Sequence, residues 1–208
     1  MQIRELAVVG AFEVTPQVHG DDRGVFLEWF RADRFEEATG HAFDLHQANC
    51  SVSSAGTVRG VHFADVPPSQ AKWVTCLHGA LLDVVVDLRV GSPTYGAWDA
   101  VLLDTTDRRA VYVSEGLGHA FMALEDETVI CYLCSAPYSP GREHGVHPLD
   151  PDLAIAWPTE HRGRPLEPLL SPRDEAAPFL ADAQAQGLLP SYDEVRAYVA
   201  GLQRPSRA

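Results

Sequence analysis

The sequence predicts an all-β protein of the sandwich or barrel type, and two observations carry that prediction. Short apolar or alternating runs recur from residue 25 to residue 135. Between them stand clusters of Gly, Pro, Asp and Ser, such as HGDDRG, DVPPSQ and VGSPTYG, which favour turns. Many short strands at this spacing are typical of sandwiches and barrels. Hydrophobic residues make up 46% of the 208 residues, which is enough to fill such a core.

Nine strands are expected in this region, each bounded by turn-forming residues. Their ranges are 25–30, 46–53, 58–63, 72–78, 80–89, 98–104, 110–113, 119–123 and 128–135. One short helix is expected at ADRFEEATG, and the tail has helical composition, with starts at Ser171 or Asp174 and at Ser191. We therefore expect one domain over residues 1–175, with residues 176–208 as a helical extension packed on it.

The charge of the chain limits the classes of partner. A net charge of −13 argues against nucleic acid, because phosphate contacts need a basic surface that this chain lacks. A small anionic ligand remains compatible, since a few arginines in one cleft can override the global sign. No apolar run is long enough to cross a bilayer, and the first residues lack the layout of a signal peptide. We expect no membrane partner and a cytoplasmic location.

The four cysteines are expected to be ordinary core thiols. Cys131 and Cys134 form a C-x-x-C pattern, but it lies within TVICYLCSA, which has the composition of a buried strand. Residues three apart on a strand point to opposite faces, so this spacing suits neither a metal site nor a redox turn. Cys50 and Cys76 carry no such pattern, and buried unreactive cysteine behaves as a small apolar residue.

Charged residues alternate with apolar ones in the strand at 80–89. One face carries Leu82, Val84, Val86 and Leu88, and the other carries Asp83, Val85, Asp87 and Arg89. For Asp87 and Arg89 the favoured interpretation is a solvated outer face with ion pairs. Asp83 lies nearer the start of the strand and is a candidate to hold a neighbouring cation.

A second polar face belongs to the strand at 46–53. Gln47, Asn49 and Ser51 share one face of it, opposite Ala48, Cys50 and Val52. Such a face either meets solvent or lines a polar cavity, and the sequence leaves both open.

The stretch TVRGVHFADVPPSQAK places Arg59 and His62 three residues apart in an apolar strand. Strict alternation would direct these two side chains to opposite faces. Gly60 stands between them, and a glycine inside a strand often marks a bulge, which would bring both side chains to one face. A single histidine in a strand is usually structural, so this pattern alone leaves the role of His62 open.

A metal site is not expected. The metal sites of β-barrel enzymes typically require two histidines one residue apart, a nearby carboxylate and a later histidine. Here His62 has no such companion, and only His119 resembles the later ligand. We therefore expect neither a metal nor another cofactor, which leaves His62 free for proton chemistry.

Six motifs in order resemble those of one known family. They are HGDDRGVFLEWF, QANCSVSSAGTVRGVHF, QAKWVTCLHGALLDVVVDLRVGSPTYGAW, SEGLGHAFMAL, YSPGREHGVHPLDPDLAIAWP and LLSPRD. Over residues 1–175 the chain resembles the dTDP-4-dehydrorhamnose 3,5-epimerases, a metal-free branch of the cupin fold. The resemblance implies a cupin-type jelly-roll β-barrel with short C-terminal helices.

The resemblance also implies a reaction, the epimerisation of a dTDP-4-keto-6-deoxy sugar at C3, C5 or both. In this family a histidine matching His62 removes the proton beside the C4 ketone, and an aspartate matching Asp174 orients it. A tyrosine matching Tyr132 is the acid on the opposite face of the sugar, and a lysine matching Lys72 stands by the enolate oxygen. These roles agree with the chemistry, because a weak carbon acid needs a base near neutral pH and a cation at the enolate.

Substrate-binding residues carry over by the same motif matches. The positions implied to contact nucleotide, pyrophosphate or sugar are Arg23, Glu28, Gln47, Asn49, Arg59, His119, Glu143 and Arg173. Tyr138 would stack on thymine. In the family Phe26 and its neighbours reach across a dimer interface, so the resemblance implies a homodimer.

Three departures from the family pattern concern specificity. Ala64 replaces a common glutamine, SEG stands where a glycine-proline pair is usual, and Arg173 replaces a lysine. These changes resemble versions from actinobacterial antibiotic-sugar pathways and leave open which carbon is epimerised. The alternatives are a mono-epimerase at C3 or C5, a non-catalytic dTDP-sugar-binding cupin and, more weakly, a ketoisomerase.

Overall fold

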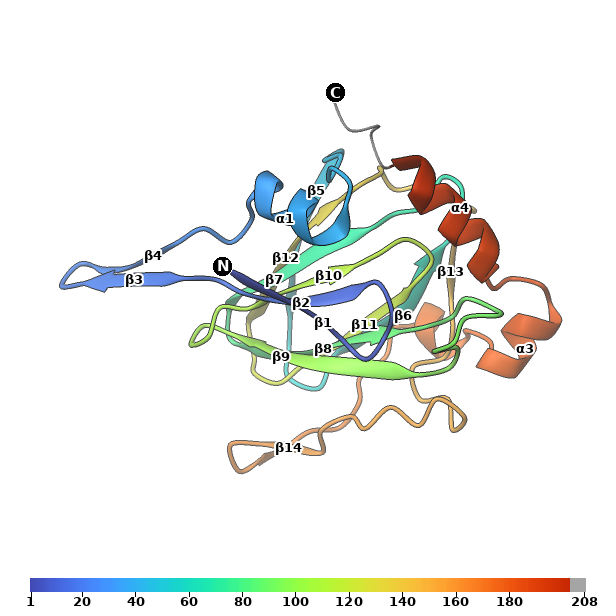
Figure 1. Cartoon of the computed structure of the whole chain (residues 1–208). Helices are drawn as coiled ribbons and strands as arrows, with labels where there is room; N and C mark the ends of the chain where they lie inside the picture. Colours follow the sequence, from blue (N-terminus) through green and yellow to red (C-terminus); the bar gives the residue numbers. More distant parts are fainter. Residues whose placement is uncertain (203–208) are drawn as a thin grey trace, which may run out of the picture.

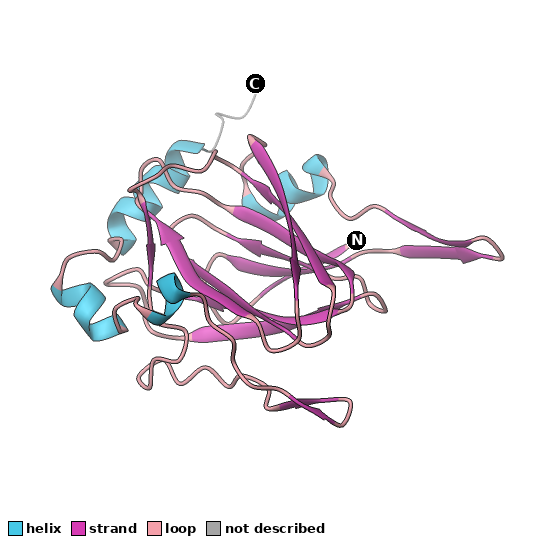
Figure 2. Cartoon of the chain, turned by 180° about the vertical axis from the view of Figure 1, so that it is seen from behind, coloured by secondary structure: helices cyan, strands magenta, loops and turns pink. Residues whose placement is uncertain are grey.

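Two antiparallel β-sheets face each other and form the body of the protein in the computed structural model, which describes residues 1–202 (Figure 1, Figure 2). The six-stranded sheet has the order β1 (Gln2–Glu5), β2 (Ala11–Thr15), β10 (Ala110–Val113), β7 (Lys72–His78), β12 (Thr128–Cys134) and β5 (Gln47–Ser53). The five-stranded sheet has the order β13 (Glu143–Gly145), β6 (Val58–Ala64), β11 (Gly118–Ala123), β8 (Ala80–Val86) and β9 (Trp98–Asp104). The predicted all-β jelly roll is confirmed, although the strands described form two sheets and not one closed ring.

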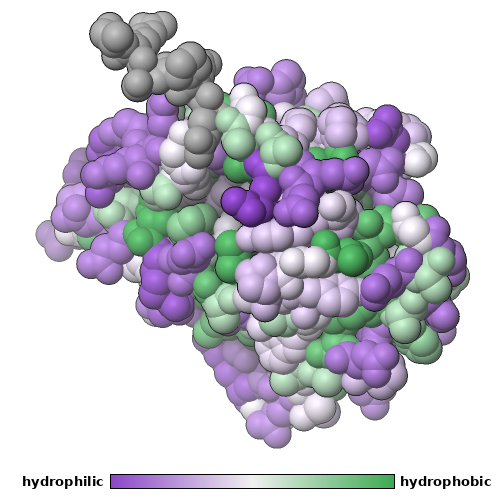
Figure 3. Space-filling view, turned by 45° about the vertical axis from the view of Figure 1, so that its right-hand side comes forward, coloured by the Kyte–Doolittle hydropathy of each residue, from purple (hydrophilic) through white to green (hydrophobic). Residues whose placement is uncertain are grey.

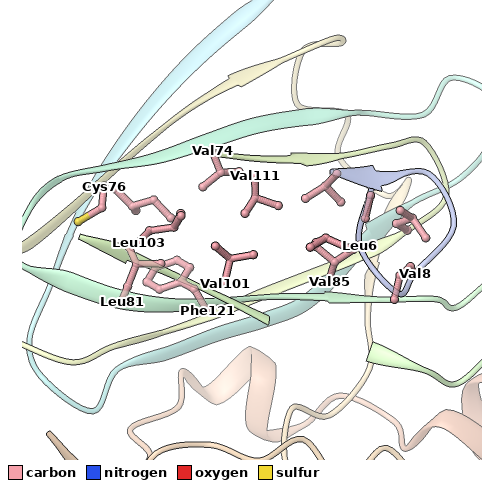
Figure 4. Packing of buried hydrophobic residues seen from close by; sticks show 14 residues of the cluster. Leu6, Val8, Val74, Cys76, Leu81, Val85, Val101, Leu103, Val111 and Phe121 are labelled. Atoms are coloured by element: carbon pink, nitrogen blue, oxygen red, sulfur yellow. The ribbon is translucent and has the colours of Figure 1, made fainter. Parts of the chain in front are cut away.

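The main apolar core fills the space between the two sheets (Figure 4). Val74 and Val111 enter it from the six-stranded sheet, and Leu81, Val85 and Phe121 enter it from the five-stranded sheet. Alternate residues of each strand face this layer, as expected for half-buried strands. The core holds the two sheets at a fixed separation.

An aromatic cluster covers the outer face of the six-stranded sheet. Phe35 of α1 (Ala32–Thr39) packs edge-on against Tyr112, with 4.8 Å between ring centroids. Trp73 and Phe43 complete the cluster, and the Trp73 indole donates to the carbonyl of Trp29 at 2.9 Å. The packing of Phe35 on the sheet stabilises α1, so ADRFEEATG forms a helix as predicted.

The C-terminal segment covers the outer face of the five-stranded sheet. Val84 and Val86 of β8 pack against Leu153 and against Leu180 of α3 (Leu180–Ala185). The remaining helices are α2 (Pro172–Glu175) and α4 (Tyr192–Leu202). Both faces of β8 are therefore buried.

The expectation of a solvated face for Asp87 and Arg89 is wrong, because both are buried. They lie just beyond the end of β8, and their side chains form a bidentate ion pair at 2.8 Å. The Arg89 guanidinium donates to the Val9 carbonyl and lies over the Tyr192 ring of α4. Ser92 and Thr94 also donate to the Asp87 carboxylate. Period-two patterning gives the two faces of a strand but does not say which face the rest of the chain covers.

The predicted strands correspond to observed ones with small shifts at their ends. The structure adds the N-terminal pair β1–β2, the strand β3 (Val18–Asp21) and the short strands β13, β14 (Glu160–His161) and β15 (Arg164–Pro165). It also adds α3, whereas α2 is capped by Ser171 and α4 starts after Ser191, as expected. The division into residues 1–175 and 176–208 stays a prediction, and residues 203–208 lie outside the described part.

A two-stranded arm projects from the body (Figure 1). It consists of β3 (Val18–Asp21) and β4 (Gly24–Leu27), which pair only with each other. Val25 and Phe26 on this arm are largely exposed, and Phe26 keeps 68% of its surface accessible. An exposed aromatic residue on a projecting hairpin is typical of a contact with another molecule.

The side of the molecule turned forward in Figure 3 shows hydrophilic residues interspersed with small apolar patches. No helix among residues 1–202 is long and apolar enough to span a membrane.

The cysteines are all free, and their burial differs from the prediction in part. Cys76 and Cys134 are buried as expected, and Cys131 and Cys134 occupy opposite faces of β12. Cys50 is exposed, which corrects the expectation of a core thiol. Cys50 lies on the outer face of β5, where Val52 and Leu77 of β7 are also exposed, and Cys131 opposite it is only partly buried.

Candidate active site

A bulge in β6 brings Arg59 and His62 to one face, as the sequence predicts. His62 pairs with His119 of β11, and Arg59 pairs with Phe121, so two residues of β6 stand against Ala120 alone. Gly60 permits this, because its φ is +127° and a Cβ there would lie 2.5 Å from the Ala120 Cβ. Both side chains therefore face the interior between the sheets.

His62 forms a short hydrogen bond with Asp174. The distance from Nε2 to Oδ1 is 2.6 Å, and Asp174 is buried at the start of α2. Burial works to raise the pKa of Asp174, but hydrogen bonds from His62 and Ser171 outweigh it and the pKa is lowered. With an ionised carboxylate accepting from Nε2–H, the Nδ1 lone pair of His62 is free to accept a proton.

Lys72, Tyr132 and Cys134 face His62 from the opposite sheet. Lys72 lies directly across from Cys134 in the β7–β12 ladder, and Tyr132 shares the face of Cys134. Burial raises the pKa of Tyr132, and it raises that of Cys134 to about 11, so both groups are neutral near pH 7. Burial lowers the pKa of Lys72, while the negative charges of Glu143 and Asp83 act against that change.

A narrow cavity of about 10 Å³ lies between His62 and Lys72. Its lining consists of His62, Phe63, Ala64, Gln70, Lys72, Val113, Leu117, His119 and Glu143. Ala64 pairs with Glu143 across the β6–β13 ladder, so the position that departs from the family pattern borders this cavity. The volume is close to that of a single water.

Gln47 and Asn49 line the interior, which resolves the open question about their strand. The Gln47 amide donates to Asn49 Oδ1 at 2.8 Å, and its oxygen accepts from the Tyr138 backbone N–H at 2.9 Å. Asn49 stands directly opposite Tyr132. Tyr138 is half exposed, and the Arg173 guanidinium donates to the Glu143 carbonyl at 3.1 Å.

Three of the expected binding residues are not brought together with the others. Arg23, Phe26 and Glu28 lie on or beside the projecting arm, away from the cavity (Figure 1). Arg23 pairs with its neighbour Asp21, and Glu28 lies 3.5 Å from Arg31. A single chain therefore presents these side chains to its surroundings and not to its own cavity.

Residues 5–182 match the family model described as dTDP-4-dehydrorhamnose 3,5-epimerase. The chain belongs to this family. It is 58% identical over 204 residues to the dTDP-4-dehydrorhamnose 3,5-epimerase of Mycolicibacterium smegmatis, with 98% of each chain covered. This epimerase is thus an enzyme of the isomerase class, as the sequence predicted.

Solved structures agree with this assignment. The Mycobacterium tuberculosis rmlC epimerase superimposes with a TM-score of 0.94 at 52% identity, covering 97% of this chain and 100% of that one. A 3'-monoepimerase from Streptomyces bikiniensis, solved in complex with dTDP-quinovose, superimposes with a TM-score of 0.90 at 48% identity. That comparison covers 95% of this chain and 98% of the other.

Two residues beside the epimerase site, Ser171 and Cys134, escaped the sequence prediction of site residues, whereas Lys72 was predicted from the family resemblance. Ser171 was identified only as a cap, although its hydroxyl also donates to the Asp174 carboxylate at 2.9 Å. Cys134 has the same strand parity as Tyr132, which was a usable signal. Lys72 is the only lysine of the sequence, and the other 15 of the 16 basic residues are arginines. The use of a single lysine in a chain otherwise rich in arginine indicates a special role for Lys72, and this can be seen from the sequence alone.

Proposed function

We propose that the chain epimerises a dTDP-4-keto-6-deoxyhexose at C3, C5 or both through an enolate. The observation that carries this proposal is the 2.6 Å His62–Asp174 pair, which faces the cavity beside Lys72. His62 is the base, because Asp174 holds its ring and stabilises the imidazolium that forms. Lys72 stabilises the negative charge on the enolate oxygen.

Tyr132 is the proposed acid on the second face of the sugar. Its pKa is raised, so it carries the proton that reprotonation requires. His62 belongs to the five-stranded sheet and Tyr132 to the six-stranded sheet. A ring held between the sheets is approached by the two groups from opposite sides, which is the requirement for inverting a carbon.

The test is uptake of solvent deuterium by a dTDP-4-keto-6-deoxyhexose, read separately at C3 and C5. We expect incorporation at one or both carbons, and none with His62→Ala. Tyr132→Phe is expected to retain exchange while losing inversion, because removal of the proton does not need the phenol. Absence of exchange in the unaltered protein would sink the proposal.

The same measurement decides between the alternatives. Relatives named as 3,5-epimerases and as 3-epimerases both resemble this chain at more than half identity, so the number of carbons is open. Deuterium at C3 alone, or at C5 alone, identifies a mono-epimerase. Tight binding of the dTDP-sugar without exchange identifies a non-catalytic binding protein. We place the reaction in deoxysugar biosynthesis for an antibiotic sugar or rhamnose.

We also infer a homodimer in which arms are exchanged. Arg23, Phe26 and Glu28 point away from the cavity of their own chain, and a second copy would supply them. The outer face of β5 and β12 is an apolar surface with a hollow of about 310 Å³, bordered by Cys50 and Leu77. Exposed apolar surface of this kind favours association. The four free thiols support the proposed cytoplasmic location.

A further inference from the structure

Asp83 is a buried carboxylate that the reaction as described does not use. It lies on the inner face of β8 between Leu81 and Val85, both part of the apolar core, and is 1% exposed. Its Oδ2 is hydrogen bonded to His119, whereas its Oδ1 has no hydrogen-bond partner among residues 1–202. An unsatisfied buried carboxylate oxygen is costly, so its presence calls for a reason.

The contrast with Asp87 shows what a structural carboxylate looks like in this protein. Asp87 is equally buried, but Arg89, Ser92 and Thr94 together satisfy both of its oxygens. Four residues earlier on the same chain segment, Asp83 has a single partner. Its partner is a residue of the cavity lining.

His119 receives its orientation from Asp83. The distance from His119 Nε2 to Asp83 Oδ2 is 2.8 Å, and the ring lines the cavity directly across the strand ladder from His62. A carboxylate that accepts from Nε2–H fixes both the tautomer and the rotation of an imidazole. Nδ1 of His119 makes no hydrogen bond to the described residues and is left for a ligand.

Lys72 is affected by the charge of the same carboxylate. Its ammonium makes no hydrogen bond within the described part of the chain, and burial lowers its pKa. Three strands besides its own contribute titratable groups around it, namely Cys134 and Tyr132 of β12, Glu143 of β13 and Asp83 of β8. His62 and His119 line the same cavity. Of these groups, Glu143 and Asp83 supply the negative charge that favours the ammonium form.

We propose that Asp83 is a positioning residue of the active site. Its Oδ2 holds the His119 ring with Nδ1 toward the substrate, and its charge keeps Lys72 an ammonium ion ready for the enolate oxygen. The inference rests on the proposed epimerase function for its catalytic consequence. The protonation of Lys72 and the tautomer of His119 can both be measured without turnover.

Two variants separate the two contributions. Asp83→Asn keeps the shape and an oxygen that accepts from His119, but removes the charge. Asp83→Ala removes both. Asp87→Asn is the matched control, because it removes an equally buried carboxylate charge. The hydrogen-bond partners of Asp87 are Arg89, Ser92 and Thr94, none of which lines the cavity.

The decisive measurement uses protein grown with ¹³C-labelled lysine. Because Lys72 is the only lysine, a single side-chain signal reports its titration directly. In Asp83→Asn we expect the midpoint of that titration, and with it the alkaline limb of kcat, to move to lower pH. In Asp83→Ala we expect in addition loss of the Nε2–H tautomer in the His119 ¹⁵N spectrum and a rise in KM of about tenfold.

The inference is overturned if Lys72 titrates identically in the unaltered protein and Asp83→Asn, or if Asp87→Asn shifts it equally. Should Asp83→Ala fail to fold, Asp83→Asn alone decides the outcome. A protein that shows the lysine shift but no deuterium exchange would refute the proposed function and retain the assignment of Asp83.

Discussion

At the scale of single residues, the site consists of polar groups kept in defined protonation states by burial and by one partner each. The Asp174 carboxylate stays ionised because His62 and Ser171 donate to it. Tyr132 and Cys134 stay neutral because burial disfavours their anions. The proposed base, the proposed acid and Lys72 can therefore lie close together without neutralising one another.

Asp174→Asn tests the partner of the base. The amide keeps the shape but neither stabilises the imidazolium nor enforces the Nε2–H tautomer, so kcat should fall by roughly 10³-fold or more. Steady-state kinetics give the loss, and a thermal melt shows whether the fold is retained. A variant with unchanged kcat would mean that His62 acts without this carboxylate.

Predictions for single residues succeeded where strand parity determined the result. They failed where the result depended on which distant segments cover a side chain. The bulge at Gly60 followed from the spacing of Arg59 and His62, because strand parity is a local property. The environment of Asp87 and Arg89 was predicted wrongly, since it depends on Val9 and Tyr192, which contact Arg89 and are far from it in the chain. The interior face of Gln47 and Asn49 was undecidable for the same reason.

At the scale of elements, α4 supports two loops that reach the cavity. Val195 packs against Gly116, whose φ is +73° and where an added Cβ would lie 2.6 Å from the valine side chain. The Tyr198 hydroxyl donates to the Pro68 carbonyl at 2.9 Å, on the turn that precedes Gln70 and Lys72. Residues 114–116, the SEG sequence that departs from the family pattern, therefore form part of the surface on which α4 packs.

Val195→Ala tests this support. Val195 is 2% exposed, and loss of two buried methyl groups should lower the free energy of unfolding by about 2 kcal/mol. Denaturant unfolding measures the change. Val9→Ala is the matched control at 37% exposure and should stay within about 0.5 kcal/mol of the unaltered protein. Equal effects at both positions would contradict a docked α4.

Element prediction followed the length of each segment. Strands such as β7 and β12 carry enough alternating residues to be recognised, whereas β14 and β15 have two residues each and no period to detect. α3 was missed because six residues give less than two turns of amphipathic pattern. Most pairing partners were beyond reach, since β1–β2 and β8–β9 alone join consecutive strands in the two large sheets described.

At the scale of the whole molecule, the arm carries three proposed binding residues, Arg23, Phe26 and Glu28, on or beside it and away from the cavity of its own chain. The proposed exchange of arms makes each cavity depend on two chains. Arg23→Ala and His62→Asn are then complementary, because one removes the arm's contribution and the other removes the base.

Mixing these two variants after unfolding and refolding together should restore activity. Half of the dimers would be mixed, each with one intact site, so about a quarter of the unaltered activity is expected. The deuterium exchange assay measures it, with each variant alone as the baseline. A mixture no more active than the mean of its components would contradict the exchange of arms.

The proposed base and acid reside on different sheets, so the apolar core has a second role as a spacer. Face-to-face sheets stand about 10 Å apart, and the side chains between them set that figure. Val74, Leu81 and Phe121 are not among the residues that line the cavity, yet their bulk sets the gap between the sheets that carry His62 and Tyr132. Thinning or thickening this layer would change how closely each group approaches a bound sugar, so we expect core substitutions to alter the balance between inversion at one carbon and at two.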